Sequence, residues 1–259
     1  MLRDEYETFI EGVRRLCGID LSSYKRPQME RRIRSFADHQ KITSLDAYLK
    51  VLQGDATALD RFLDRVTINV SELFRNPEQY QTLRSKVLGE LPRAGRVKIW
   101  SAGCSYGAEA YTLACLAIEA YPPGVRTQIV GTDIDRRVVA RAQRGRFSRE
   151  DGRSVPKATL SRFFSEEADG YQARPELQRL CSFRTGDLLR DRYEPGFDLI
   201  LCRNVVIYFT EATRNQVHAN LAKALRPGGY LMVGATERVT NPAEIGLELK
   251  HPFIYRKVA

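Results

Sequence analysis

The chain has 259 residues, 43% hydrophobic and 28% charged, a composition typical of one large globular domain or two unequal ones. Its net charge of +9 favours a polyanionic partner: nucleic acid, an anionic membrane face or an acidic protein surface. No apolar run approaches the ~20 residues of a membrane helix, and the charged N-terminus is unlike a secretory signal. Five scattered cysteines without C-x-x-C spacing indicate reduced thiols in the cytoplasm, and three histidines give little support to a metal site.

The first third of the chain, residues 1–88, is predicted to be helical. Apolar residues recur within residues 56–66 at positions i, i+3, i+4 and i+7, the spacing of one helical face. Asn76 followed by Pro77 predicts another helix, because asparagine is a favoured N-cap and proline suits the first helical position.

Two glycines and a proline in residues 89–96 interrupt this pattern, and we place a linker there between domains 1–88 and 97–259. Beyond it, short apolar runs alternate with helical stretches, which predicts a mostly parallel sheet covered on both faces. Ligands of such α/β sheets bind beyond the carboxyl ends of the strands. The runs expected to form strands are 97–102, 127–132, 181–185, 197–202, 229–235 and 253–258.

The first strand leads into a glycine turn in the stretch VKIWSAGCSYGAEAYTLA, residues 97–114. Gly103 and Gly107 allow a sharp turn and close approach of a ligand, but the dinucleotide pattern G-x-G-x-x-G is absent. Glu109 falls in the first turn of the next helix, either as a surface acid favoured by the helix dipole or as a carboxylate aimed at a ligand ammonium. An acid there would repel a phosphate.

Polar residues also follow the other strands. Asp133 ends the second strand near the spacing of the acid that binds a ribose diol in βαβ cofactor folds, although a local helix cap is the alternative. Asp187 and Leu188 follow the third strand, where they could flank an adenine ring or form a simple turn. Arg203 and Asn204 follow the fourth. An acid for an ammonium and an acid for a ribose, without a phosphate site, fit S-adenosylmethionine (AdoMet) better than NAD.

Four motifs in this order carry a resemblance: TINVSELFRNPE, the glycine-turn stretch, GTDID and FDLILCRNVVIYF. Over essentially its whole length the chain resembles the chemotaxis receptor methyltransferases, the CheR family. The resemblance implies a small all-α domain followed by an α/β, Rossmann-like, AdoMet-dependent methyltransferase domain. It also implies a small antiparallel β-subdomain inserted at about 147–186. The implied reaction is methylation of chemoreceptor glutamate side chains, giving methyl esters and S-adenosylhomocysteine, for adaptation in chemotaxis.

The resemblance also assigns roles to individual residues. Glu109 would bind the methionine ammonium and Asp133 the ribose hydroxyls, while Arg75 and Tyr208 would flank the transferable methyl group as the catalytic pair. The implied cofactor-binding residues are Asn69, Ser71, Arg75, Glu109, Asp133, Asp187, Leu188, Arg203 and Asn204. No metal is implied.

The glycine turn departs from the pattern C-S-T-G-E-E-P-Y that is usual in the family. Tyr106, Ala108 and Ala110 replace the threonine, the first glutamate and the proline. Tyr106 would either stack near the methionine end of the ligand or point outward. Ser71 replaces a threonine of some relatives and keeps the hydroxyl, and Asp187 stands where some carry asparagine.

A basic helix is expected in the stretch YKRPQMERRIRSF, which is either a solvated face or, as the resemblance implies, the surface that recognises the acidic methylation helices of the receptor. Its substrate-binding candidates are Lys25, Arg26, Arg31, Arg32 and Arg34. The inserted subdomain has only the short stretch SEEADGYQ where relatives that capture a receptor C-terminal tether have a longer glycine-rich loop. We therefore expect a cytoplasmic enzyme that does not depend on the tether, binds no nucleic acid and does not insert into a membrane.

Three other functions are compatible with parts of the sequence. A nucleic-acid methyltransferase would suit the net charge, but amino-methylating DNA enzymes usually carry an N/D-P-P-Y/F turn where this chain reads CRNVVIYF. A non-catalytic AdoMet sensor would account for the altered glycine turn. An NAD oxidoreductase lacks both its glycine motif and a histidine placed to handle a hydride.

Overall fold

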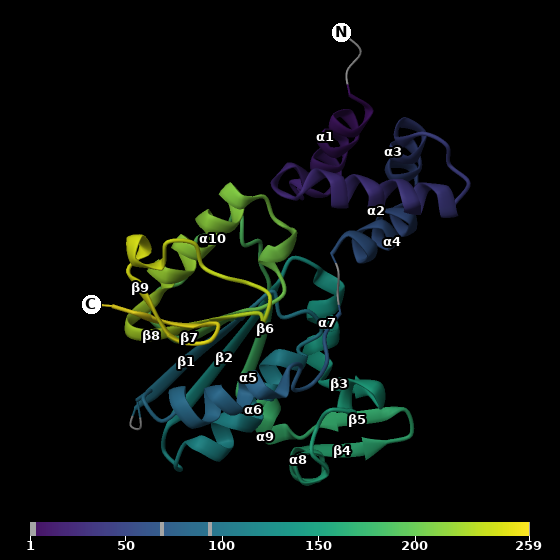
Figure 1. Cartoon of the computed structure of the whole chain (residues 1–259). Helices are drawn as coiled ribbons and strands as arrows, with labels where there is room; N and C mark the ends of the chain where they lie inside the picture. Colours follow the sequence, from purple (N-terminus) through teal and green to yellow (C-terminus); the bar gives the residue numbers. More distant parts are fainter. Residues whose placement is uncertain (1–3, 68–69, 93–94, 259) are drawn as a thin grey trace. The chain divides into compact units, whose positions relative to one another are not determined.

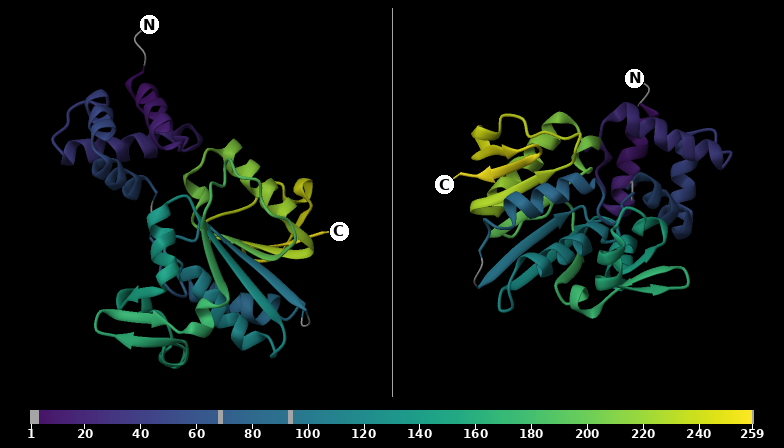
Figure 2. Two further views of the ribbon diagram at one scale, coloured as in Figure 1. Left: turned by 180° about the vertical axis from the view of Figure 1, so that it is seen from behind. Right: turned by 60° about the horizontal axis from the view of Figure 1, so that its bottom comes forward.

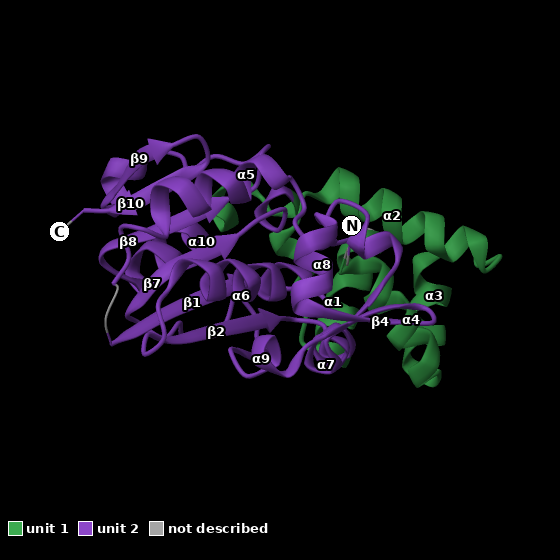
Figure 3. Ribbon diagram, turned by 90° about the horizontal axis from the view of Figure 1, so that it is seen from below, with its two compact units in different colours: residues 1–69, 208–214 green, residues 70–207, 215–259 purple. Residues whose placement is uncertain are grey.

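The computed structural model describes residues 4–67, 70–92 and 95–258, which form two compact units (Figure 3). Unit 1 comprises residues 1–69 and 208–214, and unit 2 comprises residues 70–207 and 215–259. None of the described helices is long and apolar enough to cross a membrane.

The described part of the N-terminal segment of unit 1 forms four helices around an aromatic core. The ring centroids of Phe9 and Tyr48 lie 5.7 Å apart, and Phe62 meets each of them edge-on at 5.8 Å. Phe62 belongs to the predicted apolar face of the fourth helix, and both Phe62 and Val66 of that face are buried. The helices are α1 (Glu5–Cys17), α2 (Arg26–His39), α3 (Leu45–Gly54) and α4 (Ala56–Val66), with a 3₁₀ turn at Leu21–Ser23.

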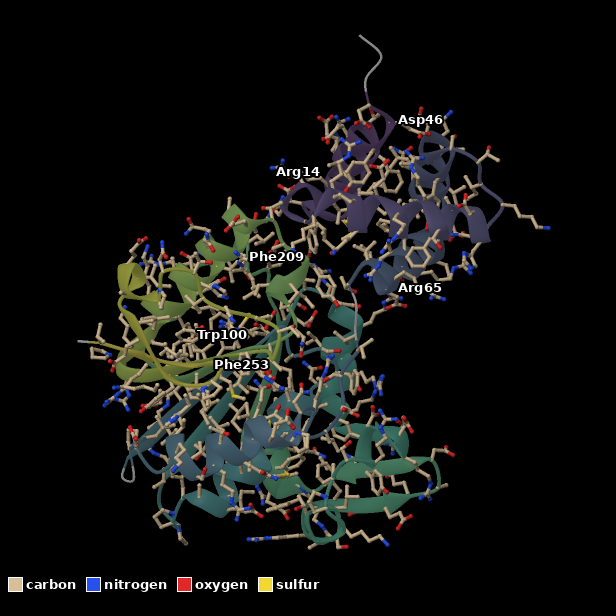
Figure 4. All side chains as sticks on the ribbon, viewed as in Figure 1. Arg14, Asp46, Arg65, Trp100, Phe209 and Phe253 are labelled. Atoms are coloured by element: carbon tan, nitrogen blue, oxygen red, sulfur yellow. The ribbon has the colours of Figure 1, made fainter. Side chains whose placement is uncertain are left out.

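A segment from late in the chain completes unit 1. The Lys25 N–H donates to the Tyr208 carbonyl and the Thr210 N–H to the Ser23 carbonyl, both at 2.9 Å. Phe209, labelled in Figure 4, pairs with Tyr24 as an antiparallel bridge, and their rings meet edge-on with centroids 5.0 Å apart. The segment that carries Tyr208 is thus fastened to the start of α2.

The two units divide before residue 70, whereas the sequence placed the linker at 89–96. Helix α5 (Pro77–Thr82) and the π-helical turn Leu83–Val87 fall in unit 2 because their apolar face joins its core. Tyr80, for example, is buried in the same cluster as the first strand of the sheet. The glycines and proline at 89–96 mark a loop into that strand.

Unit 2 contains a seven-stranded sheet in the order β6-β2-β1-β7-β8-β10-β9. The five strands from β6 to β8 are parallel, which confirms the α/β prediction, while β10 and β9 are added antiparallel at one edge. Strand β9 was not predicted, because its sequence LELKH has few apolar residues and half of it faces solvent. The strands are β1 (Arg96–Ala102), β2 (Arg126–Asp133), β6 (Cys181–Thr185), β7 (Phe197–Cys202), β8 (Leu225–Val233), β9 (Leu247–His251) and β10 (Ile254–Lys257).

The helices lie on both faces of this sheet. Helix α6 (Ala108–Ala120) connects β1 to β2 and helix α10 (Glu211–Ala224) connects β7 to β8, in opposite directions across the sheet. Right-handed crossovers therefore place them on opposite faces, as Figures 1 and 2 show. Helix α7 (Arg136–Arg144) follows β2. The strand order reverses between β1 and β7, and this switch point is where α/β sheets bind their ligands.

A small antiparallel sheet, β3-β5-β4, is inserted between α7 and β6 (Figure 1). It confirms the expected β-subdomain, but Cys181–Thr185, inside the expected range 147–186, is β6 of the main sheet and pairs with β2. The insert comprises β3 (Arg146–Ser148), a 3₁₀ turn (Glu150–Gly152), α8 (Lys157–Phe163), β4 (Phe164–Glu167), β5 (Gly170–Ala173) and α9 (Pro175–Gln178). Further 3₁₀ turns lie at Val206–Tyr208 and Pro242–Ile245.

Candidate active site

The glycine turn brings together the tips of three strands. Gly103 has φ +77° and Gly107 has φ +90°, a left-handed conformation that favours glycine. The N–H groups of Gly103 and Cys104 donate to the Thr132 carbonyl at 2.8 and 2.9 Å, so the turn is fastened to the end of β2. A side chain at Gly103 would come within 2.4 Å of Val205 in the loop after β7. The turn therefore depends on glycine for both its dihedral angle and its close packing.

Glu109 lies in the first turn of α6, as predicted, and forms a buried ion pair. Its Oε1 accepts a 2.7 Å hydrogen bond from Ser101 Oγ, and its Oε2 accepts from Arg203 Nη1 at 3.2 Å. The exposed fractions of the two ion-paired side chains are 12% for Glu109 and 2% for Arg203. A carboxylate has about four acceptor positions, so Glu109 can accept from a further donor.

Arg203 directs its guanidinium into the protein, toward the start of α5. It donates to the Arg75 carbonyl at 2.8 Å, to Asn76 Oδ1 at 3.2 Å and to Tyr80 Oη at 2.8 Å. Gln79 Oε1 accepts from two of its nitrogens, at 2.7 and 3.1 Å. Asn76 occupies the predicted N-cap position, but its side chain makes no cap hydrogen bond and binds Arg203 instead. Arg203 thus clamps the segment before and within α5.

The segment preceding α5 carries three predicted site residues. Asn69 lies outside the described residues. Ser71 is half-buried, and its carbonyl accepts a hydrogen bond from Tyr106. The Arg75 side chain donates to the Val70 carbonyl at 2.8 Å. Arg75 makes no ion pair with another described residue.

Asp133 and Asp135 have separate tasks at the end of β2. Asp135 caps α7, accepting the Arg137 N–H at 2.8 Å. Asp133 Oδ2 accepts the Ser105 N–H at 2.8 Å and its Oδ1 accepts the Asp135 N–H at 3.1 Å, so it supports the glycine turn rather than capping the helix. Burial raises the pKa of the Asp133 carboxyl despite these bonds. Ser105 Oγ is buried without a hydrogen-bond partner among the described residues.

Asp187 and Leu188 line a pocket beyond the end of β6. The pocket has a volume of about 320 Å³. Asp187 Oδ1 accepts the Leu189 N–H at 2.8 Å, so it also forms the local turn that the sequence left as an alternative. Trp100, labelled on the sheet in Figure 4, donates from Nε1 to Thr132 Oγ1 at 2.9 Å and forms part of the wall. The remaining lining includes Thr185, Gly186, Tyr193 and Phe197.

Asn204 is held by an acid that was missing from the sequence-based site. Its backbone is left-handed, with φ +59°, and its N–H donates to Glu237 Oε2 at 2.8 Å. The same oxygen accepts the Gly234 N–H at 2.6 Å. Glu237 is only 3% exposed, and burial raises its pKa. The sequence held a signal for Glu237, because this acid comes at the end of the largely apolar stretch GYLMVGATE. A buried acid needs a specific hydrogen-bond partner.

Tyr208 belongs to unit 1, whereas Arg75 belongs to unit 2. Within unit 1 the Tyr208 backbone is bound to Lys25, and the guanidinium carbon of Arg32 lies 5.9 Å from the centroid of the Tyr208 ring. The Arg32 side chain also donates to the Arg65 carbonyl at 3.4 Å. Lys25 and Arg32, two of the basic candidates for substrate binding, therefore contact Tyr208 and help to hold it in place.

The other basic candidates on α2 differ in how much of their charge is paired. Arg26 forms ion pairs with three acids, including Glu30 at 3.0 Å. Arg34 bonds to Glu30 at 2.9 Å and to Glu5 at 3.1 Å. Arg31 is exposed and has no ion pair among the described residues, while the apolar face of the helix is buried as predicted at Met29 and Ile33. Arg31 thus carries an exposed charge that no described acid compensates.

A parallel sheet with a glycine turn, acids at two strand tips and no phosphate-binding motif defines an α/β methyltransferase domain. The chain belongs to the CheR methyltransferase family: residues 4–67 match its all-alpha domain and residues 69–249 its SAM binding domain. A chemotaxis protein methyltransferase of Listeria monocytogenes is 39% identical over 99% of this chain and 98% of its own length. Chemotaxis protein methyltransferase 1 of Pseudomonas aeruginosa is 31% identical over 92% and 91%.

The chain is therefore an enzyme, an AdoMet-dependent methyltransferase, and its residues fit that ligand. Glu109, in the first turn of the helix that follows β1, and Asp133, at the end of the adjacent strand β2, provide carboxylates for an ammonium and a ribose. The buried Ser105 hydroxyl has a free hydrogen-bonding capacity beside them. The pocket at Asp187 offers an apolar wall with a carboxylate, which suits a purine.

Proposed function

We propose that this enzyme methylates glutamate side chains of chemoreceptors in chemotactic adaptation. The observation that carries the proposal is full-length similarity, over both domains, to proteins named chemotaxis protein methyltransferases. A match confined to the sheet domain would leave the substrate open, because that domain serves many acceptors. Here the helical domain, which has no place in the cofactor fold, is matched as well.

For the methyl donor, we assign the ammonium to Glu109, the ribose hydroxyls to Asp133, and the adenine side to Asp187 and Leu188. Ser71 and Arg75 reach the ligand from the segment before α5, with Asn69 beside them in sequence. Asn204 contributes through the loop after β7. Arg203 supports this site by holding Glu109 and the α5 segment, since its own donors are used inside the protein.

The proposed reaction requires no general base. The bound AdoMet supplies an electrophilic methyl group on a sulfonium. A receptor glutamate, with an ordinary pKa of about 4.3, is ionised at neutral pH. Its oxygen forms a bond to the methyl carbon as the carbon–sulfur bond breaks, the electron pair remains on sulfur, and no proton moves. Opposite charges are neutralised, so alignment and exclusion of water are the tasks left to the protein.

We assign alignment to Arg75 and Tyr208. The Arg75 guanidinium can hold the incoming carboxylate through paired hydrogen bonds. Too tight a grip would stabilise the ground state rather than the transition state. Among the described residues this guanidinium makes one hydrogen bond, to the Val70 carbonyl, which leaves donors available for this task. Tyr208 orients the methyl group rather than carrying a proton, and its backbone is fastened to the start of α2.

The basic surface of α2 is the proposed receptor-binding site. Helices that present substrate glutamates are acidic, and complementary charge raises the association rate and sets the register of binding. We expect the largest contribution from Arg31, which is exposed and unpaired by acids among the described residues, with Lys25, Arg26, Arg32 and Arg34 around it. Nucleic acid is not part of the proposal.

Independence from a receptor tether and a cytoplasmic location complete the proposal. The hairpin from β4 to β5 has only Ala168 and Asp169 between its strands, so it lacks room for a glycine-rich capture loop. No disulfide links the five cysteines among the described residues, which suits a reducing compartment. Receptor fragments with and without their C-terminal peptide should be methylated with the same kcat/KM, and a tether-dependent enzyme would lose activity on the shortened fragment.

The decisive experiment offers methyl-labelled AdoMet with a receptor cytoplasmic fragment or with nucleic acid, followed by mild base. Label that transfers to the receptor and leaves as methanol identifies a carboxyl ester and supports the proposal. Base-stable label on nucleic acid would identify a nucleic-acid methyltransferase. Binding of AdoMet without transfer to either acceptor would identify a sensor.

A further inference from the structure

Tyr106, which replaces a threonine in the glycine turn, is buried and bonds to two distant segments. It is 5% exposed and points inward. Its hydroxyl shares its one proton between two acceptors, Asp151 Oδ1 in the insert at 2.7 Å and the Ser71 carbonyl in the segment before α5. Burial, followed by the bond to Asp151, raises the pKa of the Tyr106 phenol, which therefore keeps its proton. One side chain thus joins the glycine turn, the insert and the α5 segment.

The carboxylate that receives Tyr106 is itself firmly held. Asp151 Oδ2 accepts from both the N–H and the hydroxyl of Ser148 at 2.8 Å. Arg141 of α7 lies 3.5 Å from the same carboxylate, and its guanidinium carbon lies 3.9 Å from the centroid of the Tyr106 ring. Because these contacts fix the Asp151 carboxylate, they also fix the position of the Tyr106 hydroxyl that bonds to it.

The insert also binds the α5 segment directly, at two neighbouring positions. The Leu73 N–H donates to the Asp151 carbonyl at 3.1 Å, and Arg153 forms a 3.5 Å ion pair with Glu72. The far end of the segment is held by Arg203 through the Arg75 carbonyl. Ser71 lies directly before the first anchor, and Arg75 is itself the second.

We propose that Tyr106 is a positioning residue for the methyl-donor site. Together with Asp151 it fixes the segment that presents Ser71 and Arg75, so the insert sets the affinity for AdoMet without contacting it. This inference rests on the roles given above to Ser71 and Arg75. It assigns to the β-subdomain a task within the enzyme itself, separate from any contact with a receptor.

The test compares Tyr106→Phe with Tyr111→Phe in the full-length protein. Tyr111 is a matched control because it is also a buried tyrosine near the start of α6, and its hydroxyl donates to the Ala142 carbonyl at 3.2 Å, away from the α5 segment. We expect Y106F to weaken S-adenosylhomocysteine binding by roughly three- to tenfold in calorimetry, the effect of one hydrogen bond. The KM for AdoMet should rise by the same factor and the KM for receptor should stay unchanged. In Y111F both should stay within about twofold of wild type.

A double-mutant cycle with Asp151→Asn tests the route of the effect. In the D151N background we expect Y106F to change the dissociation constant by less than about twofold, because the anchor is already weakened. Equal dissociation constants for Y106F and Y111F, or a full Y106F effect in D151N, would overturn the inference. So would S71A and R75A variants that bind S-adenosylhomocysteine as wild type does.

The outcome is independent of the proposed acceptor. If the wild-type enzyme binds S-adenosylhomocysteine but methylates no receptor fragment, the proposed function fails, while the comparison of Y106F with Y111F still decides the role of Tyr106. If the receptor is methylated and Y106F binds normally, only the positioning role fails.

Discussion

Arg203 and the arginines of α2 use the same guanidinium group in opposite ways. The Arg203 side chain is 2% exposed and donates its hydrogen bonds to Glu109 and to polar groups around α5. Arg26 and Arg34 are 45% and 42% exposed, and they share their charge between acids and solvent. A buried charge is costly to leave unpaired, whereas a surface ion pair contributes little to stability.

This difference shows which of the residues that make up the net charge of +9 can contact a partner. Arg203 contributes to that total, but its charge is compensated inside the molecule. Arg31 contributes equally and faces solvent. Net charge therefore predicts the sign of the partner, and burial and pairing decide which residues can contact it.

The largest effect is expected from Arg203→Met. Loss of the guanidinium leaves Glu109 as an unpaired buried charge and leaves several polar groups around α5 without partners. The free energy of unfolding should fall by about 3–5 kcal/mol in urea denaturation, and S-adenosylhomocysteine binding should be lost. The surface counterpart, Arg34→Met, should cost less than about 1 kcal/mol. Similar losses for the two variants would contradict the contrast.

The acid at the end of β2 should show its role in ligand affinity and in the pH dependence of that affinity. Asp133→Asn should weaken S-adenosylhomocysteine binding by about tenfold or more, because a charged acceptor of hydroxyl hydrogen bonds is lost. Burial raises the Asp133 pKa above its ordinary value of 3.8, so wild-type affinity should fall on acidification at a pH higher than that value. Calorimetry across pH would show this, and the same acid limb in D133N would contradict it.

Charge reversal on α2 should affect the receptor and spare the methyl donor. Arg31→Glu should lower kcat/KM for a receptor fragment by roughly five- to tenfold at low salt, and less at high salt, because exposed charges are screened. Affinity for S-adenosylhomocysteine should not change. Lys50→Glu makes the same charge change at an exposed position of α3 and should have little effect. Equal losses for the two variants would make the effect one of net charge alone.

The smallest effect is expected at the buried acid Glu237. The raised pKa of Glu237 means that its neutral form suits the fold, so its contribution to stability is complete below the ordinary glutamate pKa and is lost as pH rises through the raised value. Glu237→Gln keeps an acceptor for Asn204 and Gly234 and should lie within about 1 kcal/mol of wild type. Its stability relative to wild type should improve as pH increases, in denaturant titrations at several pH values. A decline with pH would show that the ionised carboxylate is the favoured form.

Local patterns in the sequence predict the frame of the site well. Apolar runs of strand length and a glycine turn placed Glu109 at the start of the helix after the first strand and Asp133 at the end of the second, on one edge of the sheet, because parallel strands present their carboxyl ends there. The helical domain and the inserted subdomain followed from the family motifs. The boundary between the units did not, since a glycine- and proline-rich stretch signals a turn whether or not a domain ends there.

What the sequence by itself determined, then, is the order of elements, the parallel sheet, the family and the residues at the strand tips. Tertiary structure decided which partners the polar side chains have. Arg203 donates to groups inside the protein, Tyr106 bonds to Asp151 and Ser71, and Glu237 accepts the Asn204 N–H. The two differ in the distance along the chain over which the interactions act. Strand, turn and cap signals act between neighbouring residues, whereas the partner of a buried polar group is chosen by which distant segments the packed core brings within hydrogen-bond distance.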